Sequence, residues 1–177
     1  MSVKSASLKD FLTLPAVEVY DRERIKKNIP HREPFLLVDE VKVLEEKKKY
    51  LGKHFVRPDE YYFKGHFPAR PVMPGVLVVE SMSQAFGGAI MGYITQGKGG
   101  LPLFLSIENA KFRGMVQPGD TLEMPIEILR LGKISKIYAE AYVNGKLYTQ
   151  ANANWPKLVN ISCILSPPTS TIQYNNI

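Results

Sequence analysis

The feature that most restricts the fold is one long helical stretch that is apolar on nearly every face. It runs from residue 75 to about residue 96, and Glu80 is its one charged side chain. A helix that is apolar all round is buried on all sides, as when a sheet wraps around it. Glu80 and several polar residues interrupt the apolar run, so a membrane span is not expected. We therefore predict a central helix enclosed by other elements.

The flanking sequence has the patterns of strands. In residues 34–56, β-branched and aromatic residues alternate with charged ones on both sides of a turn-like EEKKK, which predicts two strands. Residues 101–155 contain further runs of this kind, and Asn144-Gly145 between two of them is typical of a type I′ hairpin turn. The predicted fold class is α+β, with an antiparallel sheet packed around one long central helix.

Shorter segments connect these elements. Residues 21–28 are polar and predict a short helix that Pro30 ends. Residues 57–74 predict a long loop, because several prolines block regular strand pairing. Residues 117–120, QPGD, predict another turn. Long structured loops inside compact domains are often functional, which draws attention to residues 57–74.

Composition excludes several classes of protein. The chain has 177 residues with a net charge of +6, which is the size of one domain. The lysines are dispersed without interleaved aromatic residues, which disfavours nucleic-acid binding. The one cysteine, Cys163, allows no internal disulfide and lies near no histidine, so no metal site is expected. The N-terminus lacks a secretory signal, so we expect a cytoplasmic protein, with an organelle matrix as the alternative.

Three residues close in the sequence suggest acid–base chemistry. Glu80 in an apolar helix must be paired, hydrogen-bonded or neutral, and burial raises a carboxyl pKa, as a general acid requires. His66 lies in a loop whose prolines fix its direction, and an imidazole can act as a base near neutral pH. The Gly75 N–H at the helix start suits a carbonyl oxygen that gains negative charge. Together they suit removal of a proton α to a carbonyl and loss of a hydroxyl one carbon further on.

Structural roles are the alternative for these side chains. A histidine in such a loop is more often a hydrogen-bonded loop residue, and this applies to His66. Glu80 could equally pair with a Lys or Arg from a strand. We assign structural or surface roles to the other two histidines, His31 and His54.

Three stretches of the chain resemble the 3-hydroxyacyl-[acyl carrier protein] dehydratases of type II fatty acid synthesis, the FabZ type. The resemblance spans roughly residues 25–155, in order and with few gaps. Three separated motifs are far more specific than one short pattern. The stretches are IPHREPFLLVDEV (29–41), GHFPARPVMPGVLVVESMSQA (65–85) and FLSIENAKFRGMVQPGD (104–120).

The resemblance implies a hot-dog fold, in which an antiparallel sheet wraps a central helix. It implies that His66 and Glu80 are the catalytic pair, that they meet across a homodimer interface from opposite subunits, and that a trimer of dimers forms. The Gly75 amide matches the position that polarises the thioester carbonyl of the substrate. The related bifunctional dehydratase/isomerase, the FabA type, has Asp where this chain has Glu80, which favours plain dehydration.

The implied substrate is a (3R)-3-hydroxyacyl chain on the phosphopantetheine arm of acyl carrier protein. The implied products are the trans-2-enoyl thioester and water, with no cofactor and no metal. Acyl carrier proteins are acidic, so basic residues near the motifs are docking candidates, namely Lys64, Arg70, Lys111 and Arg113. Candidates for the lining of an acyl tunnel are Phe67, Met73, Val76, Phe86 and Phe104.

The predicted organisation is an N-terminal extension (1–24), a hot-dog dehydratase domain (25–156) and a C-terminal tail (157–177). From Ser166 onward we expect the tail to be poorly ordered or to drape over a neighbour. Hot-dog folds also serve acyl thioesterases and non-catalytic acyl-thioester binders, and these two functions remain the alternatives.

Overall fold

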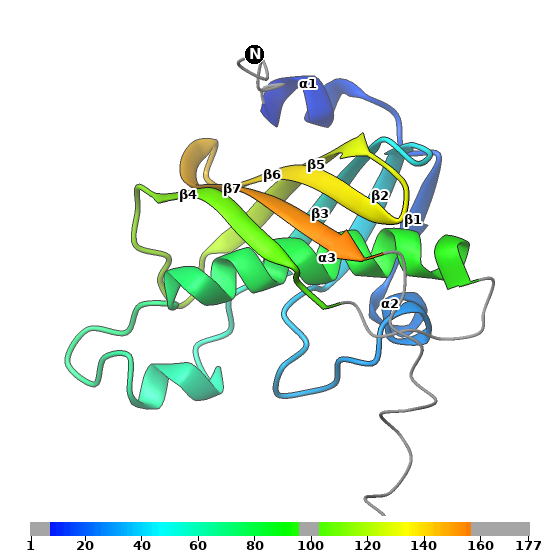
Figure 1. Cartoon of the computed structure of the whole chain (residues 1–177). Coiled ribbons are helices and arrows are strands. Elements are labelled where there is room, and N and C mark those ends of the chain that lie inside the picture. The colour runs from blue at the N-terminus through cyan, green and yellow to red at the C-terminus, as the bar shows by residue number, and fades with distance from the viewer. Residues whose placement is uncertain (1–7, 96–102, 157–177) are drawn as a thin grey trace, which may run out of the picture.

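A seven-stranded antiparallel sheet and one long helix dominate the structure, a computed structural model that describes residues 8–95 and 103–156 (Figure 1). Neighbouring strands follow the order β1-β2-β3-β5-β6-β7-β4, and every pair is antiparallel. In chain order the elements are α1 (Leu8–Thr13), β1 (Glu18–Tyr20), α2 (Arg22–Asn28), β2 (Glu40–Glu45), β3 (Lys49–Phe55), the 3-10 helix η1 (Tyr61–Lys64), α3 (Gly75–Thr95), β4 (Ser106–Phe112), β5 (Thr121–Arg130), β6 (Ile134–Val143) and β7 (Lys146–Pro156).

α3 lies across one face of the sheet, as Figure 1 shows, and the core is formed between the two. The helix contacts β2, β3, β5, β6 and β7. Every residue from 78 to 91 is buried except Glu80, which is partly exposed. The prediction of a central helix that is buried all round is therefore confirmed, and the helix ends within one residue of its predicted end.

Small residues allow α3 to lie close to its neighbours. A Cβ added to Gly52 on β3 would lie 2.6 Å from the Cβ of Ala85 on the helix. A Cβ added to Gly88 would lie 3.1 Å from Cγ2 of Ile25, which belongs to α2. Gly88 therefore allows α3 to pack closely against another helix, α2.

The short helix predicted at residues 21–28 is confirmed as α2. Asp21 caps it, and the Asp21 side chain accepts a hydrogen bond of 2.8 Å from the Arg24 amide. At the other end, Nδ2 of Asn28 donates to the Gly88 carbonyl at 2.6 Å. This bond joins the last residue of α2 to the middle of α3.

The two strands predicted within residues 34–56 are confirmed as β2 and β3, but residues 34–39 lie outside both. The Asp39 amide donates to the Lys53 carbonyl of β3 at 2.8 Å, whereas Phe35 and Leu37 are bonded to α3 instead of to a strand. The Leu37 amide donates to Oε1 of Gln84 at 2.7 Å, and the Leu37 carbonyl accepts from the Ser81 hydroxyl. Because helix side chains satisfy this backbone, the buried segment needs no strand partner.

The predicted turns are also confirmed. Asn144 and Gly145 have φ values of 49° and 74°, as a type I′ turn requires, and they join β6 to β7. In the turn at 117–120, the Asp120 amide donates to the Gln117 carbonyl at 3.1 Å. The predicted loop at 57–74 contains one regular piece, η1, which forms in a stretch between prolines.

The described residues of the N-terminal extension, 8–24, pack against the rest of the fold. Leu8 and Phe11 of α1 form a small apolar cluster with Leu44 and Leu51 on the sheet, and β1 pairs with β2. The division into 1–24, 25–156 and 157–177 stays a prediction. The tail, with Cys163 and the segment from Ser166 onward, lies outside the described residues.

Candidate functional site

His66 is held by backbone hydrogen bonds in the loop between η1 and α3. Its Nδ1 lies 2.8 Å from the Val72 carbonyl oxygen, and its amide donates to the Tyr62 carbonyl at 2.9 Å. The Val72 amide donates to the His66 carbonyl at 2.9 Å. A carbonyl oxygen only accepts, so Nδ1 carries the proton of the neutral ring. Nε2 then has a free lone pair and can take a proton.

A pocket of about 360 Å³ lies beside this histidine. His66 and Gly75, which the sequence placed in one site, both line it, as do Met73 and Val76 from the predicted tunnel. The remaining lining residues are Val72, Pro74, Val78, Phe112, Gly114, Val116 and Thr149. The pocket is therefore largely apolar, with the histidine at its wall.

The first turn of α3 supplies hydrogen-bond donors to this pocket. The amides of Leu77 and Val78 both donate to the Pro74 carbonyl, at 2.9 and 3.2 Å. Within the described chain, the Gly75 and Val76 amides have no such acceptor, as expected for the start of a helix. The positive end of the helix dipole adds to their affinity for a negatively charged oxygen.

Glu80 lies apart from this pocket. Five positions along a helix amount to about 7.5 Å of rise and about 140° of rotation, so Gly75 and Glu80 face different directions. Glu80 does not line the pocket that contains His66. One chain thus brings His66 and Gly75 together and leaves Glu80 elsewhere.

Two side chains hold the Glu80 carboxylate. Nε2 of Gln84 donates to Oε1 of Glu80 at 2.9 Å, and Nε2 of His31 lies 3.4 Å from the same oxygen. Burial alone would raise the pKa of Glu80, but the hydrogen bonds from His31 and Gln84 outweigh it, and the pKa lies below its ordinary value. The expectation of a raised pKa was wrong for the single chain, because burial was considered without these partners.

The sequence analysis gave His31 only a structural or surface role and did not consider Gln84, so it missed both as partners of Glu80. Gln84 follows Glu80 by four positions, a spacing that places two side chains on one helix face, so the sequence does contain a signal for it. His31 lies in a loop far from Glu80 in the sequence, and no local pattern connects the two.

The predicted tunnel residues fall into separate places. Met73 is buried and Val76 is exposed at the pocket of His66. Phe67 is exposed and stacks on the His66 ring, with 4.1 Å between ring centroids. Phe86 and Phe104 instead pack against Trp155, with 5.4 and 5.1 Å between the ring centroids. A tunnel through all five stays a prediction.

The four predicted docking cations are all exposed. Lys64 and Arg70 lie on either side of His66 in its loop, and Lys111 and Arg113 flank Phe112 at the end of β4. His66 and Phe112 both line the same pocket. The cations therefore come from the two segments that border it.

His54 is fully buried, which agrees with a structural role. Its Nδ1 lies 3.3 Å from Oδ2 of Asp39, and its Nε2 lies 3.7 Å from Oε1 of Glu60. Glu60 directly precedes η1, so this buried group lies at the start of the short helix that leads into the loop of His66.

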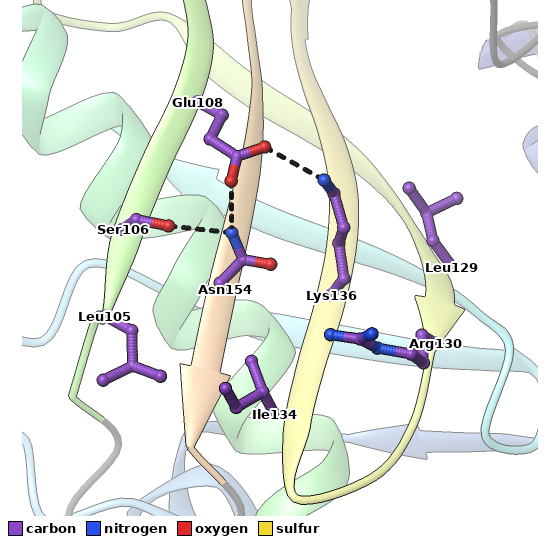
Figure 2. Close-up of a pocket in the computed structure, with 8 residues that line it drawn as sticks. All are labelled: Leu105, Ser106, Glu108, Leu129, Arg130, Ile134, Lys136 and Asn154. Carbon is purple, nitrogen blue, oxygen red and sulfur yellow. Dashed lines mark hydrogen bonds and ion pairs between the residues drawn. The ribbon is translucent and has the colours of Figure 1, made fainter. Parts of the chain in front are cut away.

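A second pocket, of about 490 Å³, lies on the face of the sheet that is turned away from α3 (Figure 2). Glu108 accepts from Lys136 at 2.9 Å and from Asn154 at 2.7 Å, and Asn154 also donates to Ser106 at 2.8 Å. The hydrogen bonds and the ion pair thus join Ser106, Glu108, Lys136 and Asn154, and none of the predicted catalytic residues lines this pocket.

Across residues 8–95 and 103–156, no group of three or more His, Cys, Asp or Glu side chains could hold a metal ion. No helix in the same residues is long and apolar enough to cross a bilayer.

Known proteins are similar to this chain in sequence. The model of the FabA-like domain family matches residues 29–152. The 3-hydroxyacyl-[acyl-carrier-protein] dehydratase FabZ of Halalkalibacterium halodurans is 44% identical over 131 residues, which cover 73% of this chain and 93% of that protein. The protein of the same name from Desulforamulus reducens is 46% identical over 132 residues, covering 74% of this chain and 92% of the relative.

Solved structures share the fold. The dehydratase heterocomplex ApeI:P from Xenorhabdus doucetiae has a chain that matches with a TM-score of 0.66 at 17% identity, covering 79% of this chain and 94% of that one. Cj0977, a sigma28-regulated virulence protein from Campylobacter jejuni, matches with a TM-score of 0.56 at 11% identity, covering 76% of this chain and 86% of that one. The predicted α+β hot-dog fold is confirmed. By the extent of the sequence match, the chain belongs to the FabA-like domain family and, within it, to the FabZ-type dehydratases.

Proposed function

We propose that this chain dehydrates (3R)-3-hydroxyacyl groups carried on acyl carrier protein, to give the trans-2-enoyl thioester and water. The observation that carries the proposal is the His66 ring, whose Nδ1 is bonded to the Val72 carbonyl, which leaves Nε2 free, and which lines one pocket with Gly75. A free imidazole nitrogen next to a helix start suits proton removal beside a carbonyl. The similarity to FabZ proteins supports the same reaction.

The reaction divides between three groups. Nε2 of His66 takes the proton from the carbon next to the thioester carbonyl. The Gly75 N–H holds the carbonyl oxygen while negative charge develops on it. Glu80 gives a proton to the hydroxyl on the next carbon, the C–O bond breaks, and water leaves as the double bond forms. The extra proton on His66 then returns to Glu80 or to solvent.

We place Glu80 of a second copy of the chain at this site. Glu80 and His66 lie apart within one chain, so a complete site needs both copies. In the single chain, 19% of the Glu80 side chain is exposed. A second copy would cover it and remove water, and burial raises a carboxyl pKa toward that of a general acid at neutral pH.

The surface of β4 supports a homodimer. β4 is an edge strand whose seven residues are all exposed, and its Ile107 and Phe112 are 47% and 51% exposed. Long exposed edges with apolar residues are ready to pair with another strand. The second copy would add its own edge here, and three such dimers would form the larger assembly.

The carrier protein would dock near the pocket entrance. Acyl carrier proteins are acidic, and the exposed cations on the two bordering segments complement that charge. The acyl chain would enter beside Met73 and Val76. We place the protein in the cytoplasm, where such carriers are used.

The test is the interconversion of a short 3-hydroxyacyl and 2-enoyl thioester, followed by absorbance, with carrier-protein thioesters as the second substrate. We expect wild-type activity and a loss of roughly a hundredfold or more in His66→Ala and in Glu80→Gln, the size typical of general acids and bases. Glu23→Gln, at an exposed surface ion pair, is the matched control and should keep full activity. Release of free thiol without dehydration would favour a thioesterase, and an inert wild type that still binds thioesters would favour a binder.

A further inference from the structure

Two donors converge on one oxygen of Glu80. The Gln84 amide nitrogen lies 2.9 Å from Oε1, and Nε2 of His31 lies 3.4 Å from it. Among the residues that the structure describes, none makes a hydrogen bond or ion pair with Oε2. The two carboxylate oxygens are therefore not equivalent.

The orientation of Gln84 follows from its other partners. Its Oε1 accepts from the Leu37 amide at 2.7 Å, and its Nε2 donates to the Phe35 carbonyl at 2.9 Å. An amide flipped by 180° would set oxygen against the Phe35 carbonyl and nitrogen against the Leu37 amide. Gln84 therefore presents N–H to Glu80, in a side chain that is fully buried.

The protonation of His31 follows from its surroundings. Its Nδ1 is buried and has no hydrogen-bond partner within the described residues. A proton on Nδ1 would be a buried N–H without an acceptor, which is unfavourable. The ring with its proton on Nε2 avoids this and donates that proton toward Oε1 of Glu80. The ring is stacked on Phe35 at 6.3 Å between centroids and 20° between planes, which holds its direction.

We propose that His31 is a positioning residue for the dehydration: its Nε2–H, with the Gln84 amide, occupies Oε1 of Glu80 and so places the transferable proton on Oε2. This rests on the proposed function. A carboxylic acid cannot readily carry its proton on the oxygen that already accepts two hydrogen bonds. After Oε2 has given its proton to the departing hydroxyl, the same two donors stabilise the carboxylate that remains.

Few other charges act on Glu80. Tyr61 of η1 is a titratable group that interacts with it, since burial and then the charges of Glu60 and Glu80 raise the pKa of that phenol. The guanidinium of Arg32 is bonded to the carbonyls of Ile29 and His31. In the described chain, His31 is thus the titratable partner that contacts the carboxylate directly.

The test compares two variants. His31→Phe keeps a ring against Phe35 and removes the donor, whereas His31→Gln keeps an N–H donor. We expect kcat to fall roughly tenfold in His31→Phe with KM little changed, and most of kcat to be regained in His31→Gln. Because the Glu80 carboxyl then keeps its proton to higher pH, the alkaline limb of the kcat/KM profile, where the general acid is lost, should move to higher pH in His31→Phe.

A second measurement does not depend on activity. NMR titration of the protein with ¹³C-labelled glutamate side chains should give a higher Glu80 pKa in His31→Phe than in wild type. The proposal would be overturned if His31→Phe had the same pH profile, the same kcat and the same Glu80 pKa as wild type. So would equal losses in both variants with an unchanged Glu80 pKa, which would mark the ring as structural. An inactive wild type with the expected NMR shift would instead refute the proposed function alone.

Discussion

The ring of Phe112 lies directly against Gly75: a Cβ added to this glycine would be 2.7 Å from Cδ1 of the ring. Phe112 ends the edge strand β4, and Gly75 begins α3. The contact therefore joins the sheet edge to the helix start at the pocket that His66 also lines. No side chain fits at position 75 unless Phe112 moves.

Gly75→Ala should reduce activity more than stability. The Phe112 side chain is half exposed and can turn away, so we expect a change of about 1 kcal/mol or less in the free energy of unfolding. The displaced ring would disturb the pocket that Phe112 lines together with His66, and we expect kcat/KM to fall roughly tenfold or more. Phe112→Ala in the same chain should restore part of the loss, as a double-mutant cycle would measure. Additive losses in the cycle would contradict this account.

Mixing two inactive variants should restore activity if each site takes one residue from each subunit. Dimers of His66→Ala and Glu80→Gln are exchanged by dilution and reassociation. In a mixed dimer, one site carries both substitutions and the other carries neither. With random exchange, about one quarter of all sites should be intact, so about a quarter of wild-type activity should return. If both residues came from one subunit, no site would be intact and activity would stay absent.

Gly52→Ala should destabilise the fold, because the new methyl group would lie 2.6 Å from Cβ of Ala85 and 3.2 Å from Cε of Met124. Ala85 cannot rotate away, so the helix must shift from the sheet. We expect a loss of roughly 1–3 kcal/mol in the free energy of unfolding, measured in urea at fixed protein concentration. The control is Gly132→Ala, where the nearest atom is 4.0 Å away. Equal effects of the two substitutions would argue against close packing at Gly52.

Asp39 is the centre of a charged network at the edge of the core. It accepts hydrogen bonds from both Arg22 and Arg57, and its Oδ2 accepts from the Phe55 amide at 2.7 Å. Burial alone would raise the pKa of Asp39, but hydrogen bonds from His54, Arg57 and the Phe55 amide lower it far below its ordinary value. The ionised carboxylate therefore stabilises the folded chain.

Asp39→Asn should destabilise the chain at pH 7 by roughly 3 kcal/mol, since it leaves partly buried cations without their partner. Because the pKa of Asp39 is lower in the folded than in the unfolded chain, its ionised carboxylate stabilises the folded state at pH values above the unfolded pKa of about 3.9. This stabilisation is lost as the pH falls from there through the folded-state pKa. The difference between wild type and variant in urea unfolding should thus shrink steadily below about pH 4. Asp59→Asn, at an exposed position, is the control. A difference that stays constant down to pH 2 would be inconsistent with this role.

Several elements follow from local sequence alone. The burial of α3 on all sides follows from its apolar composition, and the β6–β7 hairpin follows from Asn144-Gly145, because only certain residues adopt φ above zero easily. The start of α2 also follows from local sequence, because Asp21 is a residue type that commonly caps helices. These are properties of a few consecutive residues, so they can be recognised before the fold is known.

The motif residues could also be named from the sequence, but their chemistry could not. His66 and Gly75 line one pocket as expected. The raised pKa predicted for Glu80 was wrong, because the hydrogen bonds from His31 and Gln84 lower it. The proton on Nδ1 of His66 depends likewise on the Val72 carbonyl.

The sequence by itself determined which residue types were present and where the helix, strands and turns would form. The tertiary structure alone decided which of them meet. Residues 35–37 lie along α3 because Gln84 and Ser81 bond the backbone of Phe35 and Leu37, and His31 reaches Glu80 from a distant loop. Hydrogen bonding and desolvation act over a few ångströms of space and not along the chain, so residues far apart in sequence set the properties of the site.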